Sequence, residues 1–390
     1  MQRRAASPPN RNPFPVEKRG KMFYNYILNL PNAGNQPAAE MGERQVTCAV
    51  LGTDIAIDLG TSSVKIYLDG KGIILNEPSV VAYEQDTDNI VAIGHEAYAM
   101  VGRTSSKIAV VHPLCNGVIS DFALAQYVIQ HYLKKINVSR VVMPRVVVSV
   151  PCGITEVEKR AVVDAISASG VRKICLIEEP VAAAMGAGVD ISVPHGCFVI
   201  DIGGGTTDMG VISLSGVALA RSIKVAGDAF DEAIIKMVRR KYNLLIGTRM
   251  AEEAKIAIGC VYPRKEIITH RVKGRNMLTG LPQWADISCD EVLEALLEPA
   301  MQIIRTAQEV LEKTPPELMG DIDTDGIILT GGSALLYGFD TLISKKTKMK
   351  VFVPETPESC VAVGAGKAIS FIDDMENKNY GVLNPLSAAY

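Results

Sequence analysis

The sequence predicts an α/β fold composed of two related domains. Its 390 residues are 48% hydrophobic, which is enough for more than one hydrophobic core. From Thr53 onward, short apolar runs that end in glycine turns alternate with helical segments, as in α/β proteins. In addition, residues 55–61 (IAIDLGT) resemble residues 198–206 (FVIDIGGGT), because each run ends in an aspartate followed by a glycine turn and a hydroxyl residue. The two segments lie far apart and therefore indicate duplicated domains.

The expected strands are short aliphatic runs that precede turns. A composition with 33 glycines and only 5% aromatic residues fits an α/β protein with tight turns better than an all-β sandwich. We expect strands at 54–57, 146–150, 197–200 and 326–329.

Two helix starts are marked by capping boxes. Residues 155–158 (TEVE) open a helix that is expected to run to about Gly170, a suitable residue after a helix C-terminus. Residues 288–291 (SCDE) open a longer helix, which Pro299 is expected to kink. The punctuation of the sequence thus predicts helices that alternate with the strands.

Charge and cysteine content exclude several classes of protein. The formal net charge of −3 gives no global sign of nucleic-acid binding, so no direct nucleic-acid partner is expected. The cysteines are scattered without a C-x-x-C pair, which predicts neither a disulfide framework nor a zinc site and favours a reducing cytosol. No apolar run is long enough to span a bilayer, and no signal-peptide pattern is present. The sequence therefore predicts a cytoplasmic protein.

Residues 1–50 differ from the rest of the chain. They are basic and rich in proline, a composition that cannot bury enough apolar surface to order itself. Within this arm, apolar side chains recur at helical spacing over residues 22–30 and stop at Pro31. We expect a disordered arm with one short amphipathic segment. The alternative is that translation begins at Met22 or Met41.

Residues 201–208 (DIGGGTTD) predict a phosphate-binding loop. Three successive glycines leave backbone N–H groups uncovered, so that phosphate oxygens can approach them closely. The threonine hydroxyls add donors, and Asp201 offers a hard oxygen to Mg²⁺ or to its bound water. A plain β-hairpin is the alternative, but one or two glycines suffice for that turn. The pattern favours phosphate binding.

Two further segments offer similar chemistry. Residues 58–63 (DLGTSS) repeat the pattern with one glycine, and a loop from each domain could bind the β- and γ-phosphates from opposite sides. Residues 327–334 (IILTGGSA) predict a buried strand, a Gly-Gly turn and a helix, with backbone N–H groups facing outward; a packing turn is the alternative. The sequence contains neither the G-x-x-x-x-G-K-[ST] phosphate loop nor a dinucleotide-binding G-x-G-x-x-G after a strand.

Together, these segments resemble the superfamily of actin, heat-shock chaperones and sugar kinases, and within it the MreB rod-shape family. The resemblance covers about residues 53–375. It implies an actin-like ATPase fold, in which two related ribonuclease H-like domains, with four subdomains, surround a nucleotide cleft. The expected ranges are 51–193, completed by 365–390, for domain I and 194–364 for domain II. Further matching motifs are 76–80 (NEPSV), 150–155 (VPCGIT), 178–184 (EEPVAAA), 226–228 (AGD) and 313–318 (KTPPEL).

The resemblance also implies roles for particular residues. ATP is the expected nucleotide and Mg²⁺ the expected metal, held through water by Asp58 and Asp201. Glu179 is expected to polarise the attacking water, with Thr206 as a second catalytic residue; a helix-capping carboxylate is the alternative for Glu179. The residues expected to contact the nucleotide are Thr61, Ser62, Ser63, Gly204, Gly205, Thr206, Glu252, Glu253, Lys255, Thr330, Gly331, Gly332 and Ser333.

Residues 248–258 predict a helix that ends at Gly259. By spacing alone, Glu252 and Lys255 lie one turn apart and form an ordinary exposed ion pair. The resemblance implies instead that Glu252 lies near the ribose and Lys255 along the adenine.

Two departures from the family pattern bear on nucleotide affinity and turnover. Ser62, Ser63 and Val64 stand where the family usually has Ala-Asn-Thr, so that an amide and a hydroxyl are lost. Ser333 stands where the last loop usually has a third glycine, but it keeps its backbone N–H.

The resemblance implies a slow ATPase whose hydrolysis is coupled to polymerisation. Its expected partners are copies of itself in filaments, the inner face of the cytoplasmic membrane and the machinery of cell-wall elongation. Two segments are candidates for membrane contact: the basic arm with residues 22–30, and the apolar residues 141–143 before Pro144. The alternatives are a disordered tail and the entry to a buried strand.

Three other functions occur on the same fold. A plasmid-segregation filament is the nearest alternative. A small-molecule kinase needs a base directed at an acceptor hydroxyl, and no third carboxylate motif near the glycine loops supplies one. A chaperone ATPase needs a long β-rich domain, for which the residues after Ile372 leave no room.

Overall fold

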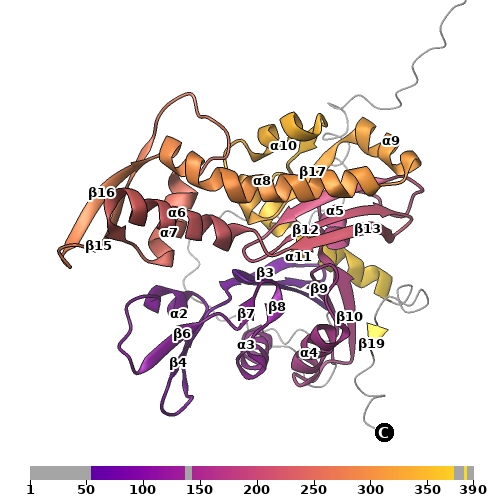
Figure 1. Ribbon diagram of the computed structural model, residues 1–390. Coiled ribbons are helices and arrows are strands. Elements are labelled where there is room, and N and C mark those ends of the chain that lie inside the picture. Colours follow the sequence, from indigo (N-terminus) through magenta and orange to yellow (C-terminus); the bar gives the residue numbers. More distant parts are fainter. Residues whose placement is uncertain (1–53, 137–142, 373–381, 384–390) are drawn as a thin grey trace, which may run out of the picture. The chain divides into compact units, whose positions relative to one another are not determined.

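The computed structural model describes residues 54–136, 143–372 and 382–383. The first large sheet contains six strands in the order β19-β10-β9-β1-β2-β3 (Figure 1). Strands β1, β2 and β3 form an antiparallel meander, and β9 and β10 continue the sheet in parallel on the other side of β1. The bounds are Ile55–Leu59 (β1), Ser63–Leu68 (β2), Gly72–Pro78 (β3), Arg145–Val150 (β9), Lys173–Glu178 (β10) and Val382–Leu383 (β19).

The second large sheet repeats this arrangement. Its five strands have the order β13-β12-β11-β17-β18, again an antiparallel meander followed by two parallel strands. The internal similarity seen in the sequence therefore corresponds to two sheets that share one strand order, apart from β19 at the edge of the first sheet, whereas the domain boundaries remain a prediction. The bounds are Cys197–Ile202 (β11), Thr207–Ser213 (β12), Gly216–Ile223 (β13), Ile327–Thr330 (β17) and Val351–Phe352 (β18).

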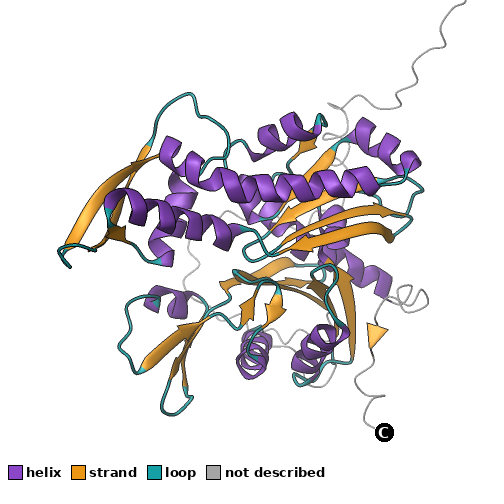
Figure 2. Cartoon of the chain, viewed as in Figure 1, coloured by secondary structure: helices purple, strands orange, loops and turns teal. Residues whose placement is uncertain are grey.

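Helices flank both sheets (Figure 2). Helices of this length are marginal in isolation, so most of their stability comes from packing. Their bounds are His95–Met100 (α2), Phe122–Lys135 (α3), Glu156–Ser167 (α4), Glu179–Gly186 (α5), Gly227–Tyr242 (α6), Thr248–Ile258 (α7), Cys289–Lys313 (α8), Pro316–Asp325 (α9), Phe339–Thr347 (α10) and Cys360–Ala368 (α11).

Successive residues of the first sheet face two different helix layers. Ile55 and Ile57 are buried in a cluster with residues of α3 and α4, whereas Ala56 between them lies in a cluster with α5 and α11. Val147 of β9 and Cys175 of β10 face the same way as Ala56. Because side chains alternate along a strand, an entirely apolar run can bury both of its faces.

Helix α5 lies between the two large sheets (Figure 1). It contacts β9 and β10 of the first sheet and β11 and β12 of the second, and α11 packs beside it against β1, β2 and β9. Residues of both sheets therefore share one buried cluster, which includes Val147 and Val199. The opposite face of the second sheet packs against α6 and α8, with Phe198, Phe230 and Ile303 in its core.

Smaller sheets complete the structure. Strands β4 (Val81–Glu84), β5 (Ile90–Ile93) and β6 (Ile108–Val111) form one three-stranded sheet beside α2, and β14 (Leu244–Leu245), β15 (Thr269–Asn276) and β16 (Pro282–Ser288) form another beside α7. The short strands β7 (Leu114–Cys115) and β8 (Val118–Ile119) pair with each other.

Both predicted capping boxes are present. At the start of α4 the Thr155 hydroxyl accepts from the Glu158 N–H, and the Glu158 carboxylate accepts from the Thr155 N–H at 2.7 Å. The corresponding box opens α8, and Pro299 lies inside that helix. Helix α4 ends at Ser167, and the turn that follows places Gly170 at a φ of 77°, a left-handed conformation that favours glycine.

Two boundaries differ from expectation. Strands β1 and β11 extend to Leu59 and Ile202, so that both predicted metal-binding aspartates lie within strands. The helix predicted after β17 is a single 3₁₀ turn, Gly332–Leu335, because its hydrogen bonds span three residues, as from Ala334 N to Gly331 O.

Among the described residues, no helix combines the length and apolar character needed to cross a membrane. The arm at 1–50, with its segment 22–30, and the residues Val141 and Val142 lie outside the part of the chain that the structure describes. Met143 is described and is 39% exposed.

Candidate functional site

A cavity of about 740 Å³ is lined by residues from both large sheets. Cavities of roughly 300–1,000 Å³ are typical of small-molecule sites. Glu253 and Thr330 lie outside this lining. The predicted site residues that line the cavity are Asp58, Thr61, Ser62, Ser63, Glu179, Asp201, Gly204, Gly205, Thr206, Glu252, Lys255, Gly331, Gly332 and Ser333.

The first predicted phosphate loop is the turn between β1 and β2. Gly60 N donates to Ser63 O at 3.1 Å, and this bond closes the turn. The Thr61 hydroxyl accepts from Gly117 N at 2.9 Å, which fixes the loop against the β7–β8 turn. The loop is therefore held in shape by one hydrogen bond within its own turn and one from the β7–β8 turn.

The second predicted phosphate loop closes the hairpin of β11 and β12. Asp201 pairs with Asp208 in the strand register, and Gly203 N donates to Thr206 O at 3.0 Å. The segment is thus a β-hairpin and also part of the cavity wall, so the two alternatives considered for residues 201–208 are compatible.

The glycines of the second loop allow it to lie directly against the first. A Cβ atom at Gly204 would lie 1.9 Å from Ser62 Oγ, and one at Gly205 would lie 2.5 Å from Thr61 Oγ1. Neither separation is possible for a side chain in this arrangement. The glycines therefore permit close approach of the two loops, in addition to the open backbone N–H groups that the sequence predicted.

The third loop connects β17 to the 3₁₀ turn. The Ser333 hydroxyl donates to Gly203 O at 2.9 Å, so the residue that departs from the family pattern joins the third loop to the second. Gly331 N donates to Pro357 O at 2.9 Å.

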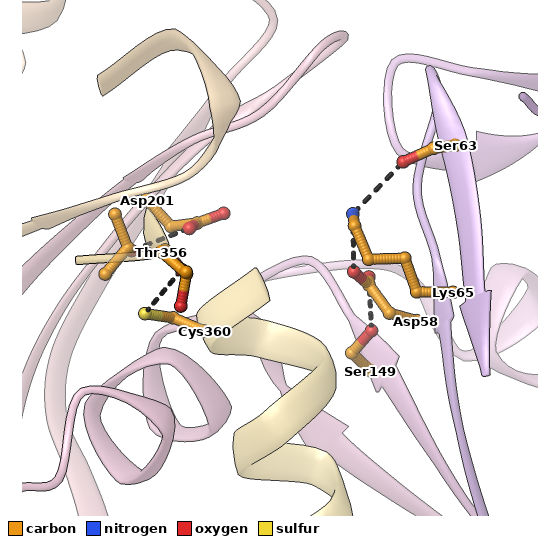
Figure 3. Close-up of polar contacts among 8 residues, drawn as sticks. Asp58, Ser63, Lys65, Ser149, Asp201, Thr356 and Cys360 are labelled. Carbon is orange, nitrogen blue, oxygen red and sulfur yellow. Dashed lines mark hydrogen bonds and ion pairs between the residues drawn. The ribbon is translucent and has the colours of Figure 1, made fainter. Parts of the chain in front are cut away.

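Three carboxylates of the lining come from different elements: Asp58 from β1, Asp201 from β11 and Glu179 from the first turn of α5. Asp58 accepts from Ser149 Oγ at 3.0 Å, and Thr330 Oγ1 donates to Asp201 Oδ1 at 2.6 Å. Figure 3 shows Asp58 and Asp201 on opposite sides of the view. Both aspartates line the same cavity, whereas their role in holding a metal remains a prediction.

Burial changes the acidity of these groups. Burial raises the pKa of Asp201 to about 7, and the charges of Asp208 and Asp58 contribute to the increase. Burial also raises the pKa of Glu179 well above its ordinary value, with Asp208 as the strongest charged neighbour. Both carboxylates therefore need a cation nearby to ionise readily at neutral pH.

Glu179 does not cap its helix. Glu178 is the N-cap residue of α5, without a side-chain capping bond, and Glu179 is the first helical residue with Pro180 behind it. Glu179 is only 8% exposed and lines the cavity. The geometry therefore favours a role toward a ligand, although its catalytic role, like that of Thr206, remains a prediction.

The donors fit a Mg²⁺ ion that is bound together with phosphate. Carboxylate oxygens are ligands that Mg²⁺ prefers, and the ion usually keeps several waters. In the described part of the chain, no group of three or more His, Cys, Asp or Glu side chains is arranged to chelate a metal directly. Asp58 and Asp201 would therefore hold the ion through water, while the phosphates supply its other oxygens.

Glu252 and Lys255 do not form the exposed ion pair that their spacing alone allowed, and their expected contacts with the nucleoside remain a prediction. Lys255 Nζ instead lies 2.7 Å from Asp231 Oδ2 and donates to Gly227 O at 3.1 Å. The Glu252 carboxylate accepts from the Tyr98 hydroxyl. The two side chains of α7 therefore turn to partners on different elements, because tertiary neighbours outweigh the weak attraction between residues one turn apart.

Glu253 is also placed apart from the cavity. Its Oε1 accepts from Arg249 Nε at 3.0 Å in a half-buried contact within α7. Its position on the helix, next to Glu252, turns it away from the site, because consecutive residues do not share a helix face.

Several residues of the site were not predicted from sequence. Lys65 and Arg264 line the cavity, Asp231 holds Lys255, and Tyr98 holds Glu252. Lys65 could have been noticed in the sequence, because it is a lysine inside the apolar run 64–68. The structure places it directly across from Asp58 in the strand register. The other three depend on which elements meet in space.

Comparisons with known proteins agree with this fold. The chain is 46% identical over 326 residues to the cell shape-determining protein MreB of Escherichia coli (strain K12), which covers 82% of this chain and 94% of that protein. It is 45% identical over 326 residues to the cell shape-determining protein Mbl of Bacillus cereus, with coverages of 83% and 98%.

Solved structures give the same relationship. The crystal structure of MreB5 of Spiroplasma citri bound to AMPPNP has a TM-score of 0.80 at 36% identity, covering 84% of this chain and 99% of that chain. The structure of the same protein bound to ADP has a TM-score of 0.79. The predicted actin-like ATPase fold is therefore confirmed. Residues 52–377 match the family described as MreB/Mbl protein, and together with the identities above this match shows that the chain belongs to the MreB/Mbl family.

Proposed function

We propose that this chain binds Mg-ATP in the cavity, hydrolyses it slowly, and assembles into filaments at the inner face of the cytoplasmic membrane that organise cell-wall elongation. The observation that carries the proposal is the convergence of two Asp-Gly-hydroxyl loops, one from each large sheet, on a single cavity. Members of the family are described as cell shape-determining proteins, and MreB5 is described as bound to ADP and to AMPPNP.

The loops supply hydrogen-bond donors for a triphosphate. Gly204, Gly205, Thr61 and Thr206 line the cavity, and the backbone N–H groups of the glycines and the hydroxyls of the threonines are the proposed donors. Phosphate transfer requires little covalent chemistry from a protein, since positioning and charge stabilisation dominate. When bound, Mg²⁺ would neutralise charge on the phosphate oxygens and on Asp58 and Asp201.

Glu179 is the residue proposed to orient the attacking water. Its carboxylate is buried in the cavity wall, and the turn that contains Pro180 fixes its backbone. A raised pKa makes a carboxylate a stronger base, provided that nearby cations keep it ionised. Lys65 and a bound Mg²⁺ would supply such charge.

Self-assembly and membrane contact extend the proposal to the cell. The match to cell shape-determining proteins favours this function over a plasmid-segregation filament or a small-molecule kinase. The candidate membrane contacts are the amphipathic segment at 22–30 and the apolar residues 141–143.

A sedimentation assay tests this function. The chain is incubated with Mg-ATP, with and without vesicles that contain anionic lipid, and pelleted polymer is measured. We expect ATP-dependent pelleting that increases when vesicles are present. This increase should be lost when residues 1–41 are removed, or when Val141, Val142 and Met143 are all replaced by Glu. A chain that stays monomeric in every condition at high concentration would contradict the proposal.

A further inference from the structure

The side chain of Lys65 is buried at the cavity wall beside the first phosphate loop. Lys65 belongs to β2 and lies directly opposite Asp58 in the antiparallel pair of β1 and β2. Its Nζ lies 3.5 Å from Asp58 Oδ2 and 3.1 Å from Ser63 Oγ, and only 10% of its side chain is exposed (Figure 3). A lysine is seldom buried unless its charge has a function or a partner.

Asp58 by itself holds this ammonium group loosely. Charge-assisted N–H···O bonds are typically 2.7–2.9 Å long, well below the 3.5 Å that separates Lys65 from Asp58. For comparison, Lys255 reaches Asp231 at 2.7 Å. An ammonium group also has three N–H donors, and Asp58 and Ser63 are the two acceptors in contact with it here. Lys65 can therefore turn toward a new anion without breaking a strong bond.

The other cationic side chains of the lining are differently placed. Lys255 is paired with Asp231, and the Arg264 guanidinium lies over the Tyr337 ring at 4.2 Å from its centre. Lys65 contacts Ser63, which belongs to the phosphate loop itself, and its charge also acts on Asp201 across the cavity. Of Lys65, Lys255 and Arg264 in the described lining, Lys65 is the one whose side chain contacts a residue of a predicted phosphate loop.

We propose that Lys65 is a built-in counter-ion for the nucleotide: it neutralises Asp58 when the cavity is empty and moves to the phosphate oxygens when a nucleoside triphosphate binds. This inference rests on the proposed nucleotide site and specifies how that site compensates charge. The released Asp58 carboxylate then becomes available to the water shell of Mg²⁺. Lysine suits this exchange, because its compact charge sits on a flexible stem and binds phosphate as a point charge.

The exchange has a consequence for metal dependence. A site that relies on Mg²⁺ alone to compensate phosphate charge loses its ligand when the metal is removed. A protein cation next to the phosphates keeps part of the attraction, and a hydrogen bond to a charged group changes an equilibrium by roughly ten- to a hundredfold. This chain should therefore retain measurable affinity for ATP in the presence of a metal chelator.

The test is a titration of the full chain with a fluorescent ATP analogue, with excess Mg²⁺ and with EDTA, for the unchanged chain and for Lys65→Met. We expect the unchanged chain to lose no more than about tenfold in affinity in EDTA, and Lys65→Met to lose a further ten- to a hundredfold there. Lys71→Met is the matched control, since Lys71 is exposed in the turn after β2, and it should behave as the unchanged chain. Lys65→Arg keeps the charge, and its affinity for the analogue in EDTA should lie between those of Lys65→Met and the unchanged chain.

If EDTA lowers the affinity of Lys65→Met and of the unchanged chain by the same factor, the inference is overturned while the proposed nucleotide site stands. No binding by the unchanged chain, even with Mg²⁺, would instead refute the proposed function itself. If Lys65→Met fails to fold, the unchanged chain decides the matter by its affinities for ATP, ADP and adenosine in EDTA. A phosphate-directed cation predicts that ATP and ADP bind at least tenfold more tightly than adenosine, and equal affinities would contradict it.

Discussion

The Tyr98 hydroxyl donates a hydrogen bond to Oε2 of Glu252, a residue 154 positions later in the chain. Tyr98 belongs to α2, beside the small sheet of β4, β5 and β6, whereas Glu252 lies on α7 and lines the cavity. Arg249, one turn before Glu252, stacks on the Tyr98 ring with its guanidinium carbon 5.5 Å from the ring centre. This contact therefore joins α2 to α7 at the wall of the cavity.

Replacement of Tyr98 by phenylalanine should speed nucleotide release. The change keeps the ring and its stacking but removes the hydrogen bond to Glu252. In the unchanged chain, burial raises the pKa of the Tyr98 hydroxyl most, and the bond to Glu252 raises it further. We expect a dissociation rate about three- to tenfold higher, in line with the loss of one hydrogen bond to a carboxylate. Stopped-flow chase of a fluorescent nucleotide measures this rate. Tyr127→Phe, at an exposed tyrosine on α3, is the control, and an unchanged rate for Tyr98→Phe would show that the contact does not restrain release.

Glu179→Gln should separate binding from hydrolysis. The amide keeps the shape of the side chain but cannot accept a proton from water, so kcat should fall by at least about a hundredfold. Affinity for ATP should stay the same or increase, because the substitution removes a buried negative charge beside the phosphates. Single-turnover hydrolysis together with equilibrium binding checks both expectations. Normal turnover would exclude Glu179 as the residue that orients the water.

Gly204→Ala should separate the two phosphate loops. The new Cβ would lie 1.9 Å from Ser62 Oγ, so one loop must move, and affinity for ATP should fall by about tenfold or more. Ser62→Gly in the same chain removes the clashing atoms and should restore part of the affinity. Gly320→Ala is the control: it lies in α9 with open space around it and should be neutral or stabilising by about 0.5–1 kcal/mol.

Glu291→Gln should destabilise the protein in a pH-dependent way. Burial opposes ionisation of Glu291, but its hydrogen bonds, that from Lys241 first, lower the pKa to about 2. Because the pKa lies below the ordinary value of 4.5 for a glutamate, the ionised group contributes stability above pH 4.5, and this contribution disappears as the pH falls from there toward 2. Because the group is partly solvated, we expect a loss of about 1–2 kcal/mol in the free energy of unfolding at pH 7.

Urea denaturation between pH 7 and pH 3.5 measures this dependence. The difference between Glu291→Gln and the unchanged chain should narrow below pH 4.5. Glu294→Gln, one turn further along α8 and exposed, should change stability by less than about 0.5 kcal/mol at every pH. A difference for Glu291→Gln that is constant over this range would mean that its charge does not contribute.

Local features account for what the sequence predicted well. Both capping boxes, and the strands that contain Asp58 and Asp201, depend on residues within a few positions of one another. The glycine loops were recognisable because an uncovered backbone needs the same residue type wherever it occurs. Their second purpose, the close contact between Gly204 and Ser62, was not visible because it involves two distant segments.

The features that the sequence could not predict are choices of partner. Lys255 has Glu252 one turn away on α7, yet it pairs with Asp231 of α6, because the packing of α6 against α7 brings that buried carboxylate within reach. Tyr98 gave no signal at all, since its partner is defined only when α2 and α7 meet. Sequence reasoning identified the kinds of residue at the site, whereas the tertiary arrangement decides which of them interact.

A crystal structure of this chain grown with Mg-AMPPNP tests most directly whether the two loops form one triphosphate site. We predict that the β- and γ-phosphates lie between residues 61–63 and 204–206, with the metal and its water beside Asp58 and Asp201 and with Lys65 Nζ turned from Asp58 toward a phosphate oxygen. A nucleotide bound elsewhere, or phosphates that contact only one of the two loops, would contradict this account.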